Sequence, residues 1–419
     1  MLSAEDNALL TQTGPGTPMG ELMRRYWIPI TLSERLQAGG APVPIEILSE
    51  RLVAYRDPAG ATGLLGEFCP HRLASLALAR NEECGLRCIY HAWKIGPDGT
   101  ILETPPEPPE VSLASKVRHT AYPTREAGGI LWAYMGPADS EPPFPMWAFN
   151  VVPVENVYPT HAFQECNWLQ GLEGDLDAAH GPYLHYTADE AEAQQQAKNR
   201  ANEYIFDKRP KAAAVTTGWG VQSVFRYLHK SGDEATFWIH PFIPPFFTLF
   251  ESNLMDITGG LMHAWVPSND NNHFVWSVSW SEDGPISQEF RDYIDTTRGY
   301  GDVNPDNNYR ANSWNGNGFT QDRARMADGS SFSGIQGILQ QDLAVQHSMG
   351  PVVDRTKEHL TSGDTVLVQV RRYLLDLVRA HDGGTGTPPG LDDGKLYRDL
   401  KFSAFTGDPD TSMRELARG

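Results

Sequence analysis

Short apolar runs, separated by glycine, proline and aspartate, recur through the first third of the chain. This pattern is typical of short strands joined by tight turns, and it predicts a small β-domain over residues 43–136. Six strands are expected, at Ile45–Leu48, Leu52–Arg56, Gly63–Phe68, Arg87–Tyr90, Thr100–Glu103 and Gly129–Tyr134. Residues 1–42 are expected to form an N-terminal arm with a short helical run at Glu21–Trp27.

Longer and more varied patterns follow residues 137–149, whose prolines indicate a linker. Extended apolar runs predict antiparallel strands at Ala213–Leu228, Glu234–His240, Phe246–Asp256, Leu261–Pro267 and Phe274–Trp280. Helical periodicity predicts helices at Trp168–Tyr183, Ser287–Thr296, Ile338–Ser348 and Asp364–Arg379. The polar tract at residues 302–318 is expected to be a loop or lid. Residues 150–419 are therefore expected to form a larger α+β domain.

Composition and charge narrow the class of protein. The chain has 419 residues, of which 40% are hydrophobic and 21% charged, as in globular proteins of two or three domains. Its net charge of -19 argues against nucleic acids and anionic membranes as partners. Neither a membrane-spanning apolar run nor a signal peptide is recognisable, so a cytoplasmic location is expected. The Gly171-x-x-Gly174 pair lacks the context of a nucleotide fingerprint, so this chain is expected to bind no NAD or flavin.

Two short segments each supply one cysteine and one histidine. They are Cys69-Pro70-His71 and, after a gap of sixteen residues, Cys88-Ile89-Tyr90-His91. This order matches a Rieske [2Fe-2S] centre, in which two cysteines bind one iron and two histidines bind the other. A structural zinc site is the alternative, but zinc fingers pair cysteine with cysteine and histidine with histidine. Both segments follow strand-like runs, so we expect them at loop tips. Cys84 and Cys166 are expected to be reduced packing residues.

A second metal site is indicated by His180 and His185, which lie five residues apart in a segment of helical pattern. Two histidines and one carboxylate on one side of a metal leave positions open for O2 and substrate, as in non-haem iron oxygenases. The Rieske motif in the same chain strengthens the interpretation of this pair as metal ligands, because the cluster needs a terminal electron acceptor. Local spacing does not locate the carboxylate. Asp342 would project from a helix, whereas Asp354 and Glu358 are interpreted as surface or capping groups.

With these motifs the chain resembles the α-subunit of a Rieske non-haem iron aromatic-ring oxygenase. The resemblance is nearest to the phthalate 4,5-dioxygenase group, whose motifs are shared by O-demethylases of lignin-derived aryl ethers. It covers nearly the whole chain, in Gly14-Pro15-Gly16-Thr17-Pro18-Met19-Gly20, the Rieske motif, Asn167-Trp168-Leu169-Gln170, Asp177-x-x-His180-x4-His185, Gln341-Asp342 and Asp354-Arg355-x-x-Glu358-His359-Leu360. It implies a Rieske β-domain followed by a helix-grip catalytic domain, with His180, His185 and Asp342 as iron ligands.

The resemblance also implies a route for the electrons. Asp177 would bridge His180 and the partner subunit's His91 in a head-to-tail trimer or in stacked trimers. A carboxylate that accepts from two metal-bound imidazoles would orient both rings. The electrons would come from a separate NAD(P)H-dependent reductase of flavin or ferredoxin type, and O2 and an aromatic compound would be the other reactants. Leu73 and Ala92 stand where glycine is common in the family.

Substrate contacts are harder to locate, because a cavity is lined by apolar side chains that resemble ordinary core residues. The aromatic and apolar candidates are Trp168, Leu172, Tyr183, Phe242 and Phe246. A substrate carboxylate would favour an arginine, and Arg209 and Arg226 are the candidates, each with the alternative of a surface arginine on a strand.

The expected function is hydroxylation of an aromatic carboxylate in aromatic catabolism. O-demethylation of a methoxyaromatic compound is an alternative within the same class. A Rieske electron carrier is an alternative of another class, but it would leave His180 and His185 unexplained. Iron content distinguishes the two classes, at about three irons per chain for an oxygenase and about two for a carrier.

Overall fold

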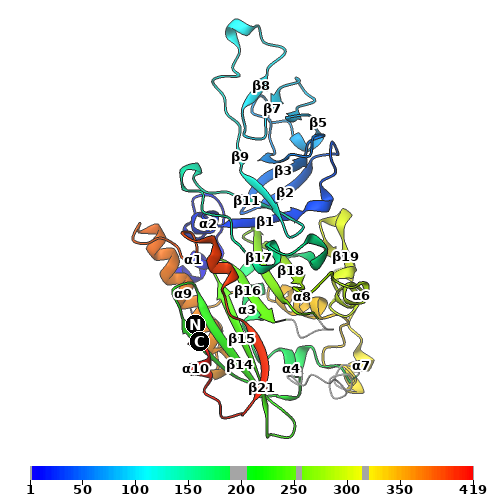
Figure 1. The fold of residues 1–419 in the computed structure, drawn as a ribbon, viewed down its shortest axis with the longest axis vertical. Helices are drawn as coiled ribbons and strands as arrows, with labels where there is room; N and C mark the ends of the chain where they lie inside the picture. Colours follow the sequence, from blue (N-terminus) through cyan, green and yellow to red (C-terminus); the bar gives the residue numbers. More distant parts are fainter. Residues whose placement is uncertain (1, 189–204, 252–256, 314–319, 419) are drawn as a thin grey trace.

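The computed structural model describes residues 2–188, 205–251, 257–313 and 320–418. Figure 1 shows an elongated molecule in which a small β-rich unit stands at one end of a larger unit built from one sheet and several helices. This arrangement confirms the predicted α+β class, with a small β-domain and a helix-covered antiparallel sheet. Within the described part of the chain, no helix has both the length and the apolar character needed to cross a membrane.

Three small antiparallel sheets build the β-rich unit. In spatial order, the first sheet contains β2 (Val43–Ile47), β3 (Glu50–Arg56), β4 (Thr62–Gly66) and β9 (Ala121–Tyr122). The second contains β5 (Arg80–Glu82), β6 (Gly85–Arg87), β7 (Lys94–Ile95) and β8 (Ile101–Glu103). The third contains β1 (Trp27–Leu32), β11 (Ile130–Tyr134) and β10 (Thr124–Ala127). The expected helix at Glu21–Trp27 is displaced, because α2 spans Pro18–Arg24 and Trp27 opens β1. The expected strand at Arg87–Tyr90 ends at Arg87, so residues 88–93 are free to form a loop.

The larger unit is organised around an eight-stranded antiparallel sheet. Its strands in spatial order are β12 (Val157–Gln164), β18 (Asn272–Trp280), β17 (Gly260–Asn269), β16 (Phe247–Glu251), β15 (Ala235–Ile243), β14 (Val221–Leu228) and β13 (Lys211–Thr216), with β21 (Ser403–Gly407) paired to β15. The expected strand Ala213–Leu228 is two strands, because a turn containing Gly218 and Gly220 separates β13 from β14. The end of the expected strand Phe246–Asp256 lies outside the described residues.

Helices cover this sheet, and their bounds agree with most of the helical predictions. They are α1 (Ala4–Thr11), α2 (Pro18–Arg24), α3 (Trp168–Asp175), α4 (Gly181–Leu184), α6 (Gln288–Thr296), α7 (Arg323–Ala327), α8 (Ile338–Ser348), α9 (Thr365–Asp382) and α10 (Met413–Leu416). The amphipathic helix α9 packs its buried face against β13, β14 and α2. The expected loop at residues 302–318 contains the short strands β19 (Val303–Asn304) and β20 (Arg310–Ala311), and its residues 314–318 lie outside the described part.

A tight turn joins the two units. Leu48 and Ser49, between β2 and β3, both have left-handed backbone angles (φ 49° and 62°), as a two-residue hairpin turn requires. Their N–H groups donate to the carbonyls of Pro267 and Ser268 at the end of β17, at 2.9 and 2.7 Å. These backbone hydrogen bonds seat the small unit on the larger sheet.

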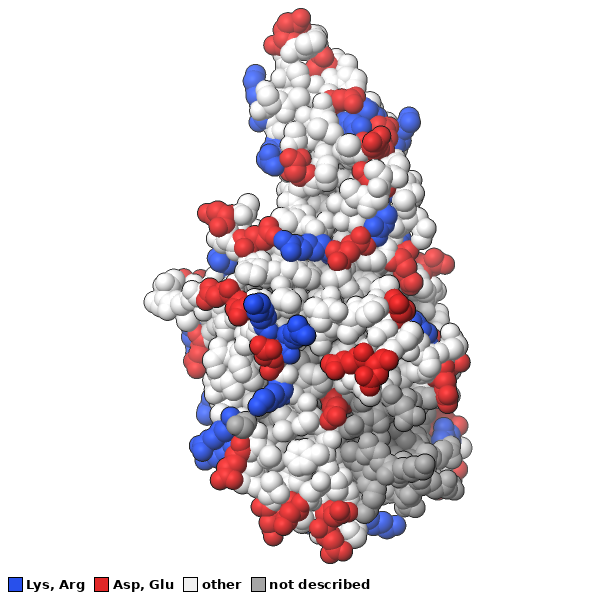
Figure 2. Space-filling view, viewed as in Figure 1, with Lys and Arg blue, Asp and Glu red and all other residues white. Residues whose placement is uncertain are grey.

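Charge is spread over the surface rather than gathered in one region of the visible face. Figure 2 shows acidic side chains on both units, from the tip of the small unit to the far end of the larger one, with basic side chains between them. On this face, therefore, the net charge of -19 does not form a single acidic docking patch.

Candidate functional site

Two loops of the small unit bring the four cysteine and histidine residues of the predicted cluster together. One loop follows β4 and carries Cys69 and His71, and the other joins β6 to β7 and carries Cys88 and His91. The cysteines are buried, at 1% and 3% exposure, whereas His71 is exposed. The two imidazole rings lie 4.5 Å apart between centroids and are inclined at 71°. The loops therefore place the two thiols inside and the two imidazoles closer to the surface.

Both loops close in the same way. The residue four positions after the cysteine donates its N–H to the cysteine carbonyl, at 2.9 Å for Leu73 to Cys69 and 3.0 Å for Ala92 to Cys88. Leu73 and Ala92 have left-handed backbone angles, with φ of 59° and 60°. That conformation costs a residue with a Cβ roughly 1–2 kcal/mol, which explains why glycine suits both positions.

The chemistry of these four residues fits a [2Fe-2S] cluster. Burial raises the pKa of the Cys69 thiol to about 11, and the neighbouring Cys88 adds to this rise, so the two sulfur atoms are close together. The Nδ1 atom of His91 is buried without a hydrogen-bond partner among the described residues. Loss of hydration and the adjacent His71 lower the pKa of His91, which favours the neutral, metal-binding form of the ring. Trp93 stacks on His71 at 4.9 Å and holds its ring in place.

In the larger unit, the second group of predicted ligands meets between α4 and α8. His180 and His185 flank α4, and Asp342 projects from α8. The Nε2 atoms of the histidines are 3.2 Å apart, and they lie 3.8 and 3.6 Å from Oδ1 of Asp342. One ligand atom from each residue lies within 4.8 Å of the others, which is the spacing that a single metal ion needs.

Hydrogen bonds to the opposite ring nitrogens orient both histidines. Nδ1 of His180 donates to the carbonyl of Asp177 at 2.8 Å, and Nδ1 of His185 donates to Oε1 of Gln341 at 2.7 Å. Gln341 in turn donates to the carbonyl of Ile335, which fixes its amide. Burial, with a further contribution from His180, lowers the pKa of His185 and so favours the neutral ring. Both Nε2 atoms therefore face Asp342, as metal-ligand histidines held by outer partners do.

Gln341 is a residue that the sequence analysis missed as an orienting group. Its signal was its position beside Asp342 on the same helix. The sequence pattern alone did not say which way the amide would point.

Two groups of Asp177, its backbone carbonyl and its carboxylate, lie near the ring of His180. Its backbone carbonyl accepts from the ring, whereas its carboxylate Oδ2 is 3.7 Å from Nδ1 and Oδ1 accepts from the N–H of Ala179 at 2.7 Å. The Asp177 side chain is 28% exposed. The carboxylate is therefore open to a second partner without being the only support of His180.

Other polar residues of the segments that carry the family resemblance hold the backbone rather than the metal site. Asn167 caps α3 by accepting from Leu169, and its amide donates to the carbonyls of two other segments. Glu173 forms buried ion pairs with Arg355 at 2.8 Å and Arg371 at 2.7 Å. Glu358 also pairs with Arg371, at 2.6 Å. Asp354 is exposed, and its carboxylate accepts from Thr356 and pairs with Lys357.

Two glycines of α3 let this helix approach its neighbours closely. A Cβ on Gly171 would meet Cδ1 of Trp265 at 2.1 Å, and one on Gly174 would meet Nε2 of Gln346 at 2.4 Å. The Gly-x-x-Gly pair therefore serves close packing of α3 against β17 and α8.

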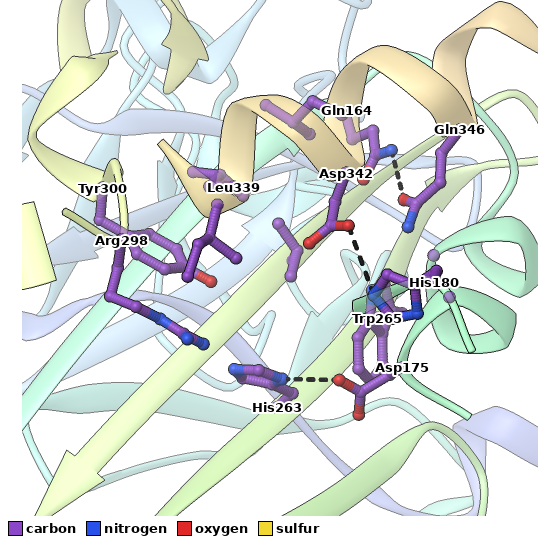
Figure 3. A pocket seen from close by; sticks show the side chains of 15 residues that line it. Gln164, Asp175, His180, His263, Trp265, Arg298, Tyr300, Leu339, Asp342 and Gln346 are labelled. Carbon is purple, nitrogen blue, oxygen red and sulfur yellow. Dashed lines mark hydrogen bonds and ion pairs between the residues drawn. The ribbon is translucent and has the colours of Figure 1, made fainter. Parts of the chain in front are cut away.

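A cavity lies beside His180 and Asp342, with about 490 Å³ of free space counted out to its open mouth. Figure 3 shows these two side chains on one side of the cavity and His263, Arg298 and Tyr300 on another. The remaining lining residues are Gln164, Gly171, Gly174, Asp175, Trp265, Val275, Ile338, Leu339, Leu343 and Gln346. The cavity thus combines apolar walls with a few convergent polar groups, as small-molecule sites do.

None of the five apolar or aromatic substrate candidates lines this cavity. Trp168, Leu172, Phe242 and Phe246 are completely buried in the main core, where the Nε1–H of Trp168 donates to the carbonyl of Leu10. Tyr183 is 39% exposed, and its hydroxyl donates to a backbone carbonyl on the surface.

The two candidate arginines also lie elsewhere. Arg209 is exposed in the segment before β13, and Arg226 on β14 donates to the carbonyl of Pro409. The arginine that lines the cavity is Arg298, which follows α6. Neither Arg298 nor His263 belongs to a motif, so only the fold could reveal them.

Two family profiles match the chain. Residues 26–121 match the Rieske [2Fe-2S] domain, and residues 133–405 match a domain described as LigXa C-terminal domain like. The second match covers more than half of the chain and includes His180, His185 and Asp342.

Three known proteins illustrate the similarity. The phthalate 4,5-dioxygenase oxygenase subunit of Pseudomonas putida is 36% identical over 397 residues, covering 92% of this chain and 88% of that protein. The 5,5'-dehydrodivanillate O-demethylase oxygenase subunit of Sphingobium sp. is 43% identical over 195 residues, covering 44% of each chain. The crystal structure of dicamba monooxygenase bound to 3,6-dichlorosalicylic acid shares the fold, with a TM-score of 0.61 at 16% identity, covering 86% of this chain and 98% of that one.

Proposed function

The chain belongs to the Rieske non-haem iron oxygenases, and we propose that it is the terminal oxygenase of a system that hydroxylates an aromatic carboxylate. It is an oxidoreductase of the class that uses a [2Fe-2S] cluster and a mononuclear iron. The observation that supports the proposal best is the presence of both candidate centres in one chain. A Rieske electron carrier does not account for the ligand atoms gathered within 4.8 Å around Asp342.

Seven side chains are assigned to the two metal groups. They are Cys69, His71, Cys88 and His91 for the cluster, and His180, His185 and Asp342 for the iron. When bound, the iron supplies activation of O2 and the cluster supplies electrons one at a time. The protein orients the iron-site rings through Gln341 and the Asp177 carbonyl, and it encloses the substrate between apolar walls.

An aromatic acid is the substrate class that the cavity and the relatives favour. Phthalate, dehydrodivanillate and dichlorosalicylic acid, in the names of the three similar proteins, are all aromatic carboxylates. The lining of the cavity includes Trp265 and Val275 for a ring and Arg298 for an anion. Ring hydroxylation is preferred because the phthalate relative matches almost the full chain. O-demethylation is the second candidate, favoured by the 43% identity to the dehydrodivanillate enzyme over part of the chain.

Product analysis tests this proposal. The enzyme, with its cluster pre-reduced, is mixed with O2 and phthalate, 3-chlorobenzoate or methoxybenzoates, and the products are identified by mass spectrometry. We expect ring-hydroxylated acids and about three irons per chain. Formaldehyde from a methoxybenzoate would identify demethylation instead, and about two irons with no product would identify an electron carrier.

We further propose that electrons cross between chains in a head-to-tail trimer or stacked trimers. The elements that carry the two candidate centres, β6 and β7 on one side and α4 and α8 on the other, belong to different units of the molecule (Figure 1). In such an assembly Asp177 would lie between His180 and the partner subunit's His91. A separate NAD(P)H-dependent reductase of flavin or ferredoxin type would reduce the cluster.

The assignment of His91 predicts a shift in reduction potential. In His91→Cys a thiolate replaces a neutral imidazole, and this should lower the cluster potential by on the order of 100 mV and alter its absorption and EPR spectra. The matched control is His381→Cys on α9, which should leave both unchanged. A reduced EPR signal identical to that of the wild type in His91→Cys would remove His91 from the cluster.

A further inference from the structure

Opposite the iron-site residues, the cavity has a second polar wall that no motif predicted. It is formed by His263 on β17 and Arg298 after α6, and Asp175 at the end of α3 contacts His263 from the side on which His180 lies (Figure 3). In Figure 3 the free ring nitrogen of His263 and the guanidinium of Arg298 point toward one another. Two donors that converge in a cavity wall form a natural site for an anion.

Asp175 holds His263 in a fixed orientation. Nδ1 of His263 is 3.1 Å from Oδ1 of Asp175, and both side chains are only 11% exposed. The other carboxylate oxygen accepts from Thr248 at 2.5 Å and lies 3.5 Å from Nε2 of His240. Burial alone would raise the pKa of Asp175, but the neighbouring His263 and His240 lower it well below its usual value. The carboxylate is therefore ionised and accepts the Nδ1 proton of His263.

The remaining nitrogen of His263 lacks a protein partner. His263 is 9% exposed, and its Nε2 has no hydrogen bond to any described residue. Buried polar atoms in native proteins nearly always have a partner, so an unpaired nitrogen in a cavity wall is a position where a ligand or a water molecule can bind. Because Asp175 occupies Nδ1, the group that faces this ligand is Nε2.

Arg298 adds a positive charge to the same wall. Arg298 lines the same cavity as His263, Tyr300 and Asp342, so its guanidinium contributes to this polar wall.

We propose that Asp175, His263 and Arg298 form a carboxylate-binding subsite, in which Nε2 of His263 and the guanidinium of Arg298 donate to the anionic group of the substrate. This inference rests on the proposed aromatic-acid function and names the residues that recognise the acid. Asp175 is a positioning residue, because it acts through His263. The ring of the substrate then lies against the apolar walls, between this subsite and the side of the cavity formed by His180 and Asp342.

Calorimetric titration of the iron-loaded enzyme tests the subsite directly. The probes are benzoate and phthalate, each compared with its uncharged carboxamide. We expect the wild-type protein to prefer the acids. His263→Gln and Arg298→Gln should each weaken acid binding by about 10- to 100-fold, since each loses a hydrogen bond to a charged group, and should leave amide binding nearly unchanged. Asp175→Asn should weaken acid binding to a smaller extent while both metal centres keep their absorption spectra.

Two matched variants control for general effects of the substitutions. Arg226→Gln on β14 and His381→Gln on α9 lie outside the cavity lining and should retain the acid preference. If the cavity variants keep the wild-type acid preference, or if the wild type binds acids and amides equally, the subsite is overturned. If Arg226→Gln loses acid binding instead, the anion lies elsewhere and the subsite is likewise overturned.

The outcome separates the subsite from the proposed function. Acid binding that depends on His263 and Arg298, together with no oxygenated product from any acid, would support the subsite and reject the proposed reaction. Oxygenation of acids by a His263→Gln enzyme with unchanged KM would support the reaction and reject the subsite. Where His263→Gln does not fold, Arg298→Gln gives the same discrimination, because it leaves the Asp175 hydrogen bonds intact.

Discussion

Replacing either His180 or His185 by alanine should remove the mononuclear iron and reduce turnover by about a thousandfold or more. Each histidine supplies one of three ligand atoms, and their Nε2 atoms are only 3.2 Å apart, so the loss of one leaves a two-ligand site. The Rieske absorption should survive, because the four cluster residues lie in the other unit. Iron analysis, visible spectra and product formation from the same preparation measure the three effects together.

The third ligand is tested by comparing two carboxylates that lie in different places in the structure. Asp342→Ala should behave as His180→Ala does, because its Oδ1 lies within 3.8 Å of both histidine nitrogens. Asp354→Ala should retain iron and activity, since its carboxylate is exposed and contacts Thr356 and Lys357. Iron loss in Asp354→Ala with normal iron in Asp342→Ala would show that the third ligand is misassigned. Three irons and normal turnover in His185→Ala would reject the triad as a whole.

There is a physical reason why the sequence alone offers candidate metal-binding residues that the fold then brings together. The cluster is held by two short segments, so the order of Cys69, His71, Cys88 and His91 already describes the chemistry. In the iron site, only His180 and His185 are close to each other in the sequence. Asp342 lies far along the chain, and the family resemblance was needed to select it over other acids. The fold then places it beside the two histidines through the packing of α3 and α8.

Substrate recognition was not readable from the sequence, because the relevant side chains carry no pattern of their own. Trp168 and Phe242 have the composition of a binding pocket, but they fill the core. Arg298 and His263 come from separate elements and meet only when β17 and the segment after α6 converge on one cavity. In the sequence, His263 is one residue of a predicted strand, and nothing there distinguishes it from the other strand residues that face the same side of the sheet. Its role becomes visible only through Asp175, a partner on another element.

Changing Asp177 to asparagine should slow electron transfer between the centres by roughly 100-fold while leaving both centres in place. The backbone carbonyl of Asp177, which accepts from His180, is unaffected by the substitution, and an asparagine oxygen still accepts from the N–H of Ala179. The negative charge near Nδ1 of His180 is lost, and an amide NH2 group, which donates and cannot accept, replaces the carboxylate oxygen Oδ2. The side chain is 28% exposed, so that charge is available to a second imidazole from a partner subunit.

The measurement is a single turnover. Enzyme with a pre-reduced cluster is mixed with a substrate acid and O2, and reoxidation of the cluster is followed by absorbance, with iron content and oligomeric state determined on the same sample. Ala179→Gly is the matched control, because it alters a residue two positions after Asp177 but keeps the Asp177 charge and the backbone N–H that donates to Asp177. Reoxidation at the wild-type rate by a correctly assembled Asp177→Asn trimer would reject the bridging role. Loss of iron from that variant would instead make Asp177 a ligand or a structural support, and the assignment of Asp342 would then have to change.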